Sequence, residues 1–130
     1  EGLPSFASID VSFISLNLIL PALAKILVDG GQVVALVKPQ FEAGREQIGK
    51  NGIVREISVH EKVLETVTAF AVDYGFSVKG LDFSPIQGGH GNIEFLAHLE
   101  KTNSPQNDAQ TSIKEVVAQA HKEFKKNEEE

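Results

Sequence analysis

The sequence predicts an α/β fold in which strands and helices alternate before an antiparallel pair of strands. Two observations carry this prediction. Residues 32–38 (QVVALVK) form a continuous apolar run, which is typical of a strand buried on both faces of a parallel sheet. Residues 58–74 repeat apolar side chains at helical spacing. The resulting order, β-α-β-α-β-β-α, is expected for the second half of a doubly wound, Rossmann-like sheet.

The first half of the chain supplies a strand, a helix and the apolar strand. Residues 6–13 are rich in β-forming side chains, and the apolar positions of residues 15–28 share one helical stripe. Pro39 ends the apolar strand. Residues 40–57 have mixed charge and no clear period, so we expect a long loop there.

The helix over residues 58–74 has sequence signals at both ends. Ser58 and Glu61 have the spacing of a capping box, in which each side chain accepts a backbone hydrogen bond at the helix start. Gly75 suits the left-handed position that follows a helix. We therefore expect a helix with well-defined ends.

The last part of the chain predicts two strands and a final helix. Residues 76–83 form a strand that Gly80 could bulge, and residues 93–99 alternate apolar and polar side chains. Because their connection is short, the two strands should pair antiparallel. Residues 112–126 form an amphipathic helix.

Composition limits the classes of function. The chain has 130 residues and no cysteine, which allows one modest core and excludes disulfides and thiolate metal sites. The four histidines lack metal-ligand spacing, so no metal site is expected. No apolar run is long enough for a membrane span, and a cytoplasmic location is expected. A net charge of −6 disfavours a stand-alone nucleic-acid binder.

Two polar residues stand where such sheets gather their chemistry, at the carboxyl ends of parallel strands. Asp10 lies near the exit of the first strand, and Lys38 ends the second. Their positions make them candidate site residues. Taken alone, a strand-end lysine is also typical of a solvated surface.

Four stretches resemble the hemolysin A (TlyA) family of RNA methyltransferases, which is related to the FtsJ-type ribose 2′-O-methyltransferases. These stretches are 7–16 (ASIDVSFISL), 34–44 (VALVKPQFEAG), 49–54 (GKNGIV) and 84–96 (SPIQGGHGNIEFL). They occur in the family's order and span residues 6–99. The resemblance divides the chain into 1–101, the C-terminal half of an FtsJ-like methyltransferase domain, and 102–130, a linker, amphipathic helix and acidic tail.

The resemblance implies a Lys-Asp-Lys-Glu set that methylates a ribose 2′-hydroxyl of ribosomal RNA with S-adenosyl-L-methionine. Asp10, Lys38 and Glu94 match three members of the set, with Asp10 adjacent to the cofactor. The first lysine, the glycine-rich cofactor loop and an S4-like RNA-binding domain are expected upstream of Glu1. The chain begins without Met, so we expect a piece that is inactive alone.

The chemistry explains why these residue types are needed. A ribose hydroxyl is a poor nucleophile until it loses its proton, and a neutral lysine can accept that proton. Nearby carboxylates can orient the lysine and balance its charge. Lys38 is therefore the predicted general base, and Asp10 and Glu94 its positioning partners.

Partners and competing functions follow from the remaining sequence. Arg45, Lys50 and Arg55 could contact phosphates of ribosomal RNA or of a ribosomal subunit, although nearby glutamates make an ordinary solvated loop equally reasonable. A non-catalytic assembly module is an alternative, because half a sheet leaves a strand edge open to self-association. A membrane-active cytolysin, suggested by the family's name, is another.

Overall fold

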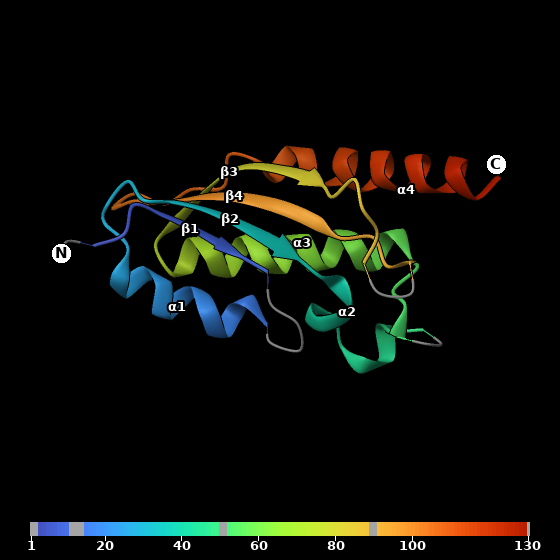
Figure 1. Cartoon of the computed structure of the whole chain (residues 1–130), viewed down its shortest axis with the longest axis horizontal. Helices are drawn as coiled ribbons and strands as arrows, with labels where there is room; N and C mark the ends of the chain where they lie inside the picture. Colours follow the sequence, from blue (N-terminus) through green and yellow to red (C-terminus); the bar gives the residue numbers. More distant parts are fainter. Residues whose placement is uncertain (1–2, 11–14, 50–51, 89–90, 130) are drawn as a thin grey trace.

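The computed structural model describes residues 3–10, 15–49, 52–88 and 91–129, and all structural statements below concern these residues. Side chains of Arg45 and of residues 126–129 lie outside the description. A mixed sheet forms the centre of the molecule, with helices packed along it (Figure 1).

The sheet contains β1 (Phe6–Ile9), β2 (Gln32–Val37), β3 (Phe76–Phe83) and β4 (Phe95–Lys101) in the order β1-β2-β4-β3. Strand β1 pairs parallel with β2, whereas β4 pairs antiparallel with both β2 and β3. This mixed sheet confirms the predicted α/β class and the antiparallel final pair. The last strand, however, lies inside the sheet and separates β2 from β3.

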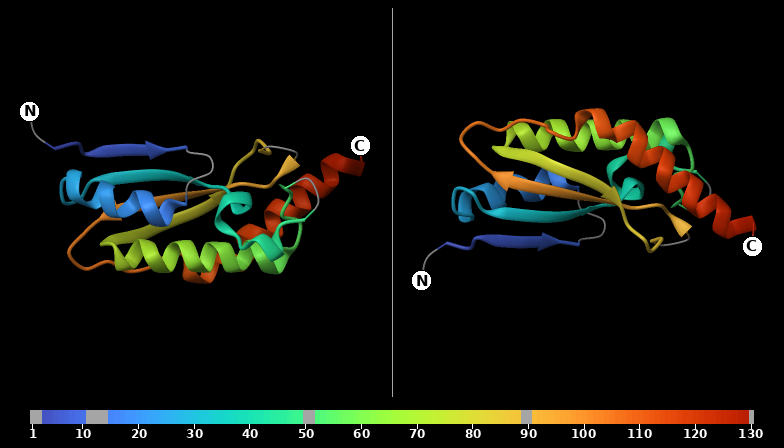
Figure 2. Two further views of the ribbon diagram at one scale, coloured as in Figure 1. Left: turned by 90° about the horizontal axis from the view of Figure 1, so that it is seen from below. Right: turned by 90° about the horizontal axis from the view of Figure 1, so that it is seen from above.

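Four α-helices accompany the sheet: α1 (Leu16–Ile26), α2 (Pro39–Glu42), α3 (Ile57–Asp73) and α4 (Ile113–Glu129). Helices α1 and α3 lie side by side along one face, and α4 packs against α3 and β3 at the far border (Figure 2). Helix α4 thereby adds its apolar side to the same core.

Two predicted boundaries and one predicted loop were wrong. Strand β1 ends at Ile9, so it is shorter than the expected 6–13; residues 11–14 lie outside the described part. Strand β4 begins at Phe95, two residues late. The expected loop 40–57 starts with α2 and contains a short 3-10 helix over 45–47, because Pro39 is pre-set for a first helical turn.

The ends of α3 test the capping signals. The predicted capping box was wrong: α3 starts one residue early, its N-cap is Glu56, and no side chain caps it. Ser58 lies inside the first turn and is exposed. The C-terminal signal is confirmed, since Gly75 has a φ of 94°. The predicted bulge is confirmed by a register shift between Val78 and Gly80.

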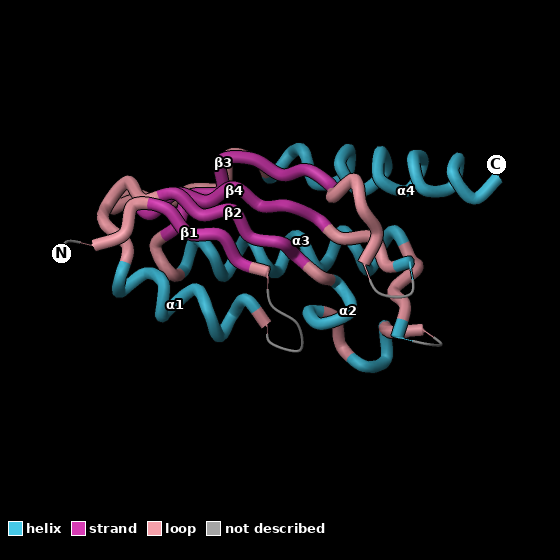
Figure 3. The backbone as a smooth tube through the Cα atoms, viewed as in Figure 1, coloured by secondary structure: helices cyan, strands magenta, loops and turns pink. Residues whose placement is uncertain are grey.

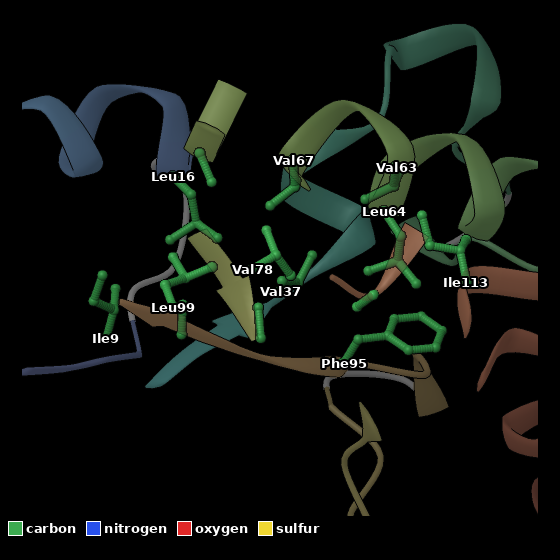
Figure 4. Close-up of a cluster of buried hydrophobic side chains, with 14 of the residues drawn as sticks. Ile9, Leu16, Val37, Val63, Leu64, Val67, Val78, Phe95, Leu99 and Ile113 are labelled. Atoms are coloured by element: carbon green, nitrogen blue, oxygen red, sulfur yellow. The ribbon is translucent and has the colours of Figure 1, made fainter. Parts of the chain in front are cut away.

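The core lies between one face of the sheet and the helices (Figure 4). Residues that share this face are paired across the strands: Val37 with Phe95, Ala35 with Ala97 and Val33 with Leu99. All six are at most 1% exposed. Burying apolar area on this scale supplies the main favourable term in folding.

A histidine pair joins α3 to α4. His60 is fully buried, and its Nδ1 lies 2.7 Å from Nε2 of His121. The pKa of His60 is lowered to about 4, chiefly by burial and also by the charge that His121 carries when protonated, while a hydrogen bond with the backbone of Val54 opposes the shift. Burial also lowers the pKa of His121. Near neutral pH, both rings are therefore uncharged within the helix interface.

Acidification should weaken this interface. The pKa of His60 in the fold, about 4, lies below its ordinary value of 6.5. Its contribution to stability is therefore complete above about pH 6.5 and is lost as the pH falls towards 4, by roughly 2 to 3 kcal/mol. Chemical denaturation at a series of pH values should show a smaller loss for His60→Gln than for the unsubstituted protein.

The matched control is His98→Gln, since His98 is exposed on β4. This control should keep the original pH dependence. Equal pH dependence in His60→Gln and the unsubstituted protein would show that the buried ring does not carry the effect.

Candidate active site

The carboxyl ends of β1 and β2 lie beside each other because the two strands are parallel neighbours (Figure 3). Asp10 directly follows β1, and Lys38 directly follows β2. The Nζ atom of Lys38 lies 2.6 Å from Oδ1 of Asp10. The lysine side chain is 14% exposed and the aspartate side chain 69% exposed, so the pair lies at the rim of the sheet with its carboxylate towards solvent.

Glu94 reaches the same end of the sheet from the opposite direction. It immediately precedes β4, and the pairing of Val37 with Phe95 extends to place Glu94 across from Lys38. Glu94 is 6% exposed. The structure therefore brings all three predicted residues to one end of the sheet, although their catalytic roles stay predictions.

Two contacts fix the carboxylate of Glu94. The Nε2 atom of Gln40 donates a hydrogen bond of 2.7 Å to Oε2 of Glu94. A Cβ atom added to Gly88 would lie 1.9 Å from the same oxygen, so the β3–β4 connection passes directly beside the carboxylate, which a side chain at that position would displace. The carboxylate is thus held between α2 and this connection.

A further carboxylate, Glu42, ties α2 to the start of α1. Its Oε1 accepts hydrogen bonds from Oγ of Ser15 at 2.6 Å and from the backbone amide of Leu16 at 3.0 Å. These donors stand at the N-terminus of α1, where an anion satisfies backbone N–H groups and meets the positive end of the helix dipole. Burial raises the pKa of Glu42, and the two hydrogen bonds oppose that shift.

Glu42 therefore links the two segments that leave the site. The chain runs from Asp10 to α1 on one side and from Lys38 through α2 on the other. The bonds of Glu42 hold the start of α1 beside the segment that follows Lys38. Sequence reasoning missed Glu42 and Gln40, although both belong to the four residues that directly follow Lys38 (PQFE).

Asn92, at the end of the β3–β4 connection, organises the neighbouring loop. It is 2% exposed, its Oδ1 accepts from the backbone amide of Val54, and its Nδ2 donates to the carbonyl of Gly52. These bonds, of 2.9 and 3.0 Å, attach residues 52–54 to the β3–β4 connection. The loop is thereby held next to Glu94.

The predicted RNA-contacting residues are only partly visible. Arg55 is exposed and directly follows the buried Val54. Lys50 and the side chain of Arg45 lie outside the described residues. The structure therefore places one of the three predicted cations, and their contacts with RNA stay a prediction.

The described residues form neither a metal site nor a membrane-spanning helix. No group of three or more His, Cys, Asp or Glu side chains in the described part could hold a metal ion. None of the described helices combines the length and the apolar character needed to cross a membrane.

Known proteins resemble the chain over most of its length. It is 54% identical over 128 residues to a Bacillus subtilis (strain 168) protein provisionally named rRNA methyltransferase YqxC, covering 96% of this chain and 46% of that protein. It is 38% identical over 90 residues to TlyA of Mycobacterium tuberculosis (strain CDC 1551 / Oshkosh), named 16S/23S rRNA (cytidine-2′-O)-methyltransferase. That match covers 69% of this chain and 34% of TlyA.

A solved structure agrees with the fold. A provisionally named hemolysin from Streptococcus thermophilus has 95% sequence identity and a TM-score of 0.97, over 99% of this chain and 46% of that one. The chain thus spans about half the length, or less, of the proteins it matches. The FtsJ-like methyltransferase family matches residues 2–101, and the chain belongs to that family.

Proposed function

We propose that this chain is part of an S-adenosyl-L-methionine-dependent enzyme that methylates a ribose 2′-hydroxyl of ribosomal RNA. The observation that carries the proposal is the ion pair between Asp10 and Lys38, at adjacent strand ends of an FtsJ-like chain. The activity named for TlyA, cytidine-2′-O-methylation of 16S and 23S rRNA, supports this substrate. Such a substrate would place the reaction in the cytoplasm.

Lys38 is the proposed proton acceptor. Once its ammonium form has lost a proton, the amine of Lys38 would take the proton of the 2′-hydroxyl. The ribose oxygen would then be free to accept the methyl group that the cofactor supplies, and the electrons of the broken sulfur–carbon bond would stay on sulfur. A side chain that is 14% exposed can touch substrate while little water competes for it. The ion pair to Asp10 holds the amine in place before substrate binds.

Asp10 and Glu94 are proposed to orient this amine. Asp10 lies at ion-pair distance, and Glu94 is buried opposite Lys38 and held by Gln40. The exposed carboxylate of Asp10 also suits a cationic cofactor, which would lie beside it. When bound, S-adenosyl-L-methionine supplies a methyl group carried by a positively charged sulfur.

The remaining parts of the chain have proposed supporting roles. Residues 1–101 form the C-terminal half of the methyltransferase domain, and 102–130 add a linker and the helix that packs on β3. The activity, like the ribosomal partner, belongs to the full-length protein. On this basis, residues 1–130 alone should not methylate RNA.

The free edge of β1 could pair with a strand from outside this chain. Strand β1 pairs with β2 alone among the described strands, and Phe6 on β1 is 59% exposed. An unpaired edge of this kind accepts a further strand. We propose that another strand covers the free edge of β1 in the assembled protein. In the isolated chain, a second copy could supply that strand, which would cause self-association.

Replacing Lys38 tests the proton acceptor. In the full-length protein, Lys38→Ala should lower the rate of RNA methylation by about 10² to 10⁴, because the transition state loses its base. Binding of S-adenosyl-L-methionine, measured by calorimetry, should persist. The matched control is Lys79→Ala, which removes a lysine paired with Asp108 at a 40% exposed site and should leave the rate unchanged. Near-normal activity of Lys38→Ala would contradict the assignment.

Replacing Glu42 tests the link between α1 and α2. Glu42→Ala should reduce the free energy of unfolding by about 1 to 3 kcal/mol, because Ser15 and the Leu16 amide lose their acceptor. Methylation should slow while cofactor affinity changes little. Glu42→Gln, which keeps an acceptor oxygen, should recover much of both losses.

Glu65→Ala provides the comparison, since Glu65 is exposed on α3. It should match the unsubstituted protein in both stability and rate. If Glu42→Ala lost stability but kept its full rate, Glu42 would have only a structural role.

A further inference from the structure

A pocket of about 730 Å³ opens between α4, the start of α3 and the β3–β4 connection. Its described lining contains three cationic side chains, two histidines and no carboxylate; the cations are Arg55, Lys122 and Lys125. All three are exposed. Lys122 and Lys125 are three residues apart on α4, so they project on the same side of the helix.

This positive lining is unusual in an acidic chain with a net charge of −6. The pocket beside α1 shows the contrast, because it is lined by four carboxylates and one lysine: Glu42, Glu46, Glu65, Asp73 and Lys62. Glu56 and Glu123 are sequence neighbours of the cations, yet neither lines the pocket between α3 and α4. The described lining of this pocket therefore carries cations without carboxylates, unlike the pocket beside α1.

A buried polar atom also belongs to this pocket. His60 lines it and is 0% exposed, and its Nε2 has no hydrogen-bond partner among the described residues. The ring is held by His121 and by an edge contact with Phe95, whose centroid is 5.5 Å away. Because this nitrogen is covered on all sides, the ring forms part of the pocket wall, and contacts with a ligand fall to the exposed cations.

Part of the pocket lining is adjacent in sequence to a candidate active-site residue. Its lining includes Gly91 and Ile93, and Ile93 directly precedes Glu94. Its other wall includes Val54, whose amide is bound by Asn92. The C-terminal part of α4 lies at the end of the sheet where α2 begins (Figure 1). A bound polymer could therefore contact both places.

We propose that this pocket binds the phosphodiester backbone of the RNA substrate. A guanidinium and two ammonium groups suit phosphate oxygens, and the absence of carboxylates from the described lining avoids repulsion. The choice of RNA rests on the proposed function. Neither Lys122 nor Lys125 has a part in the proposed methyl transfer, so the pocket governs binding of RNA and leaves the reacting atoms untouched.

Charge reversal on α4 tests the pocket. In the full-length protein, Lys122→Glu with Lys125→Glu should weaken binding of a fluorescently labelled single-stranded ribosomal RNA by about tenfold or more. The slope of log affinity against log salt should fall by about 1.4, since each phosphate contact on a single strand contributes about 0.7. KM for RNA should rise while kcat at saturating RNA is retained.

The matched control reverses two exposed lysines outside the pocket, Lys25→Glu with Lys114→Glu, and changes net charge equally. It should bind RNA nearly as the unsubstituted protein does. Equal weakening by both double variants would overturn the pocket and leave only a general charge effect. An unchanged affinity and salt slope in the α4 variant would overturn it as well.

A second measurement needs no substitution. Titrating the unsubstituted protein with the same RNA should shift the ring NMR signals of His60 and His121, because both rings line the pocket. Unmoved signals at saturating RNA would overturn the proposal even if the α4 variant failed to fold. If RNA binds through the pocket but is never methylated, the proposed function fails while the pocket stands.

Discussion

Antiparallel pairing between β2 and β4 is the constraint on which the rest of the molecule depends. It sets Val37 opposite Phe95, which aligns the apolar face of both strands with α1 and α3. The same register leaves Lys38 and Glu94 as the next residues beyond the pairing. A shift of one residue would turn both faces over and move these polar side chains with them. The register between β2 and β4 therefore determines both the packing of the core and the position of the candidate site.

Short polar contacts then fix the segments that leave the strands. Glu42 binds the start of α1, Gln40 binds Glu94, and Asn92 binds the loop before α3. Each joins parts of the chain that are distant in sequence. These groups are largely removed from solvent, and a buried polar atom without a hydrogen bond is costly. Each of these bonds takes the place of the hydrogen bond to water that the polar atom gave up on folding. The rim of the sheet is held by such bonds where the apolar core ends.

The sequence was informative where a signal is local and repeated. The apolar run of β2 and the helical period of α3 both predicted elements that the structure contains. The rule that chemistry gathers at parallel strand ends also predicted that Asp10 and Lys38 lie together, as their 2.6 Å contact shows. Helix α2 was missed because four residues are too few to show a period.

Other features depend on partners far along the chain, which no local pattern reveals. The position of β4 inside the sheet is set by its fit between β2 and β3. Glu94 is buried because Gln40 and the backbone at Gly88 close over it. The pairing of Glu42 with Ser15 spans 27 residues. The capping box at Ser58 failed because the helix begins at Ile57, so that Ser58 already lies within the first turn.

The inner position of β4 has a consequence for how the protein reaches its fold during synthesis. Strands β2 and β3 have no hydrogen bonds to each other and are joined only through a strand that is made after both. The sheet therefore cannot grow strand by strand as the chain emerges, because its centre stays empty until residues 95–101 arrive. Non-local pairing of this kind slows folding and leaves apolar strands open to wrong partners in the meantime. A nascent chain with this topology is most vulnerable to aggregation just before its last strand leaves the ribosome.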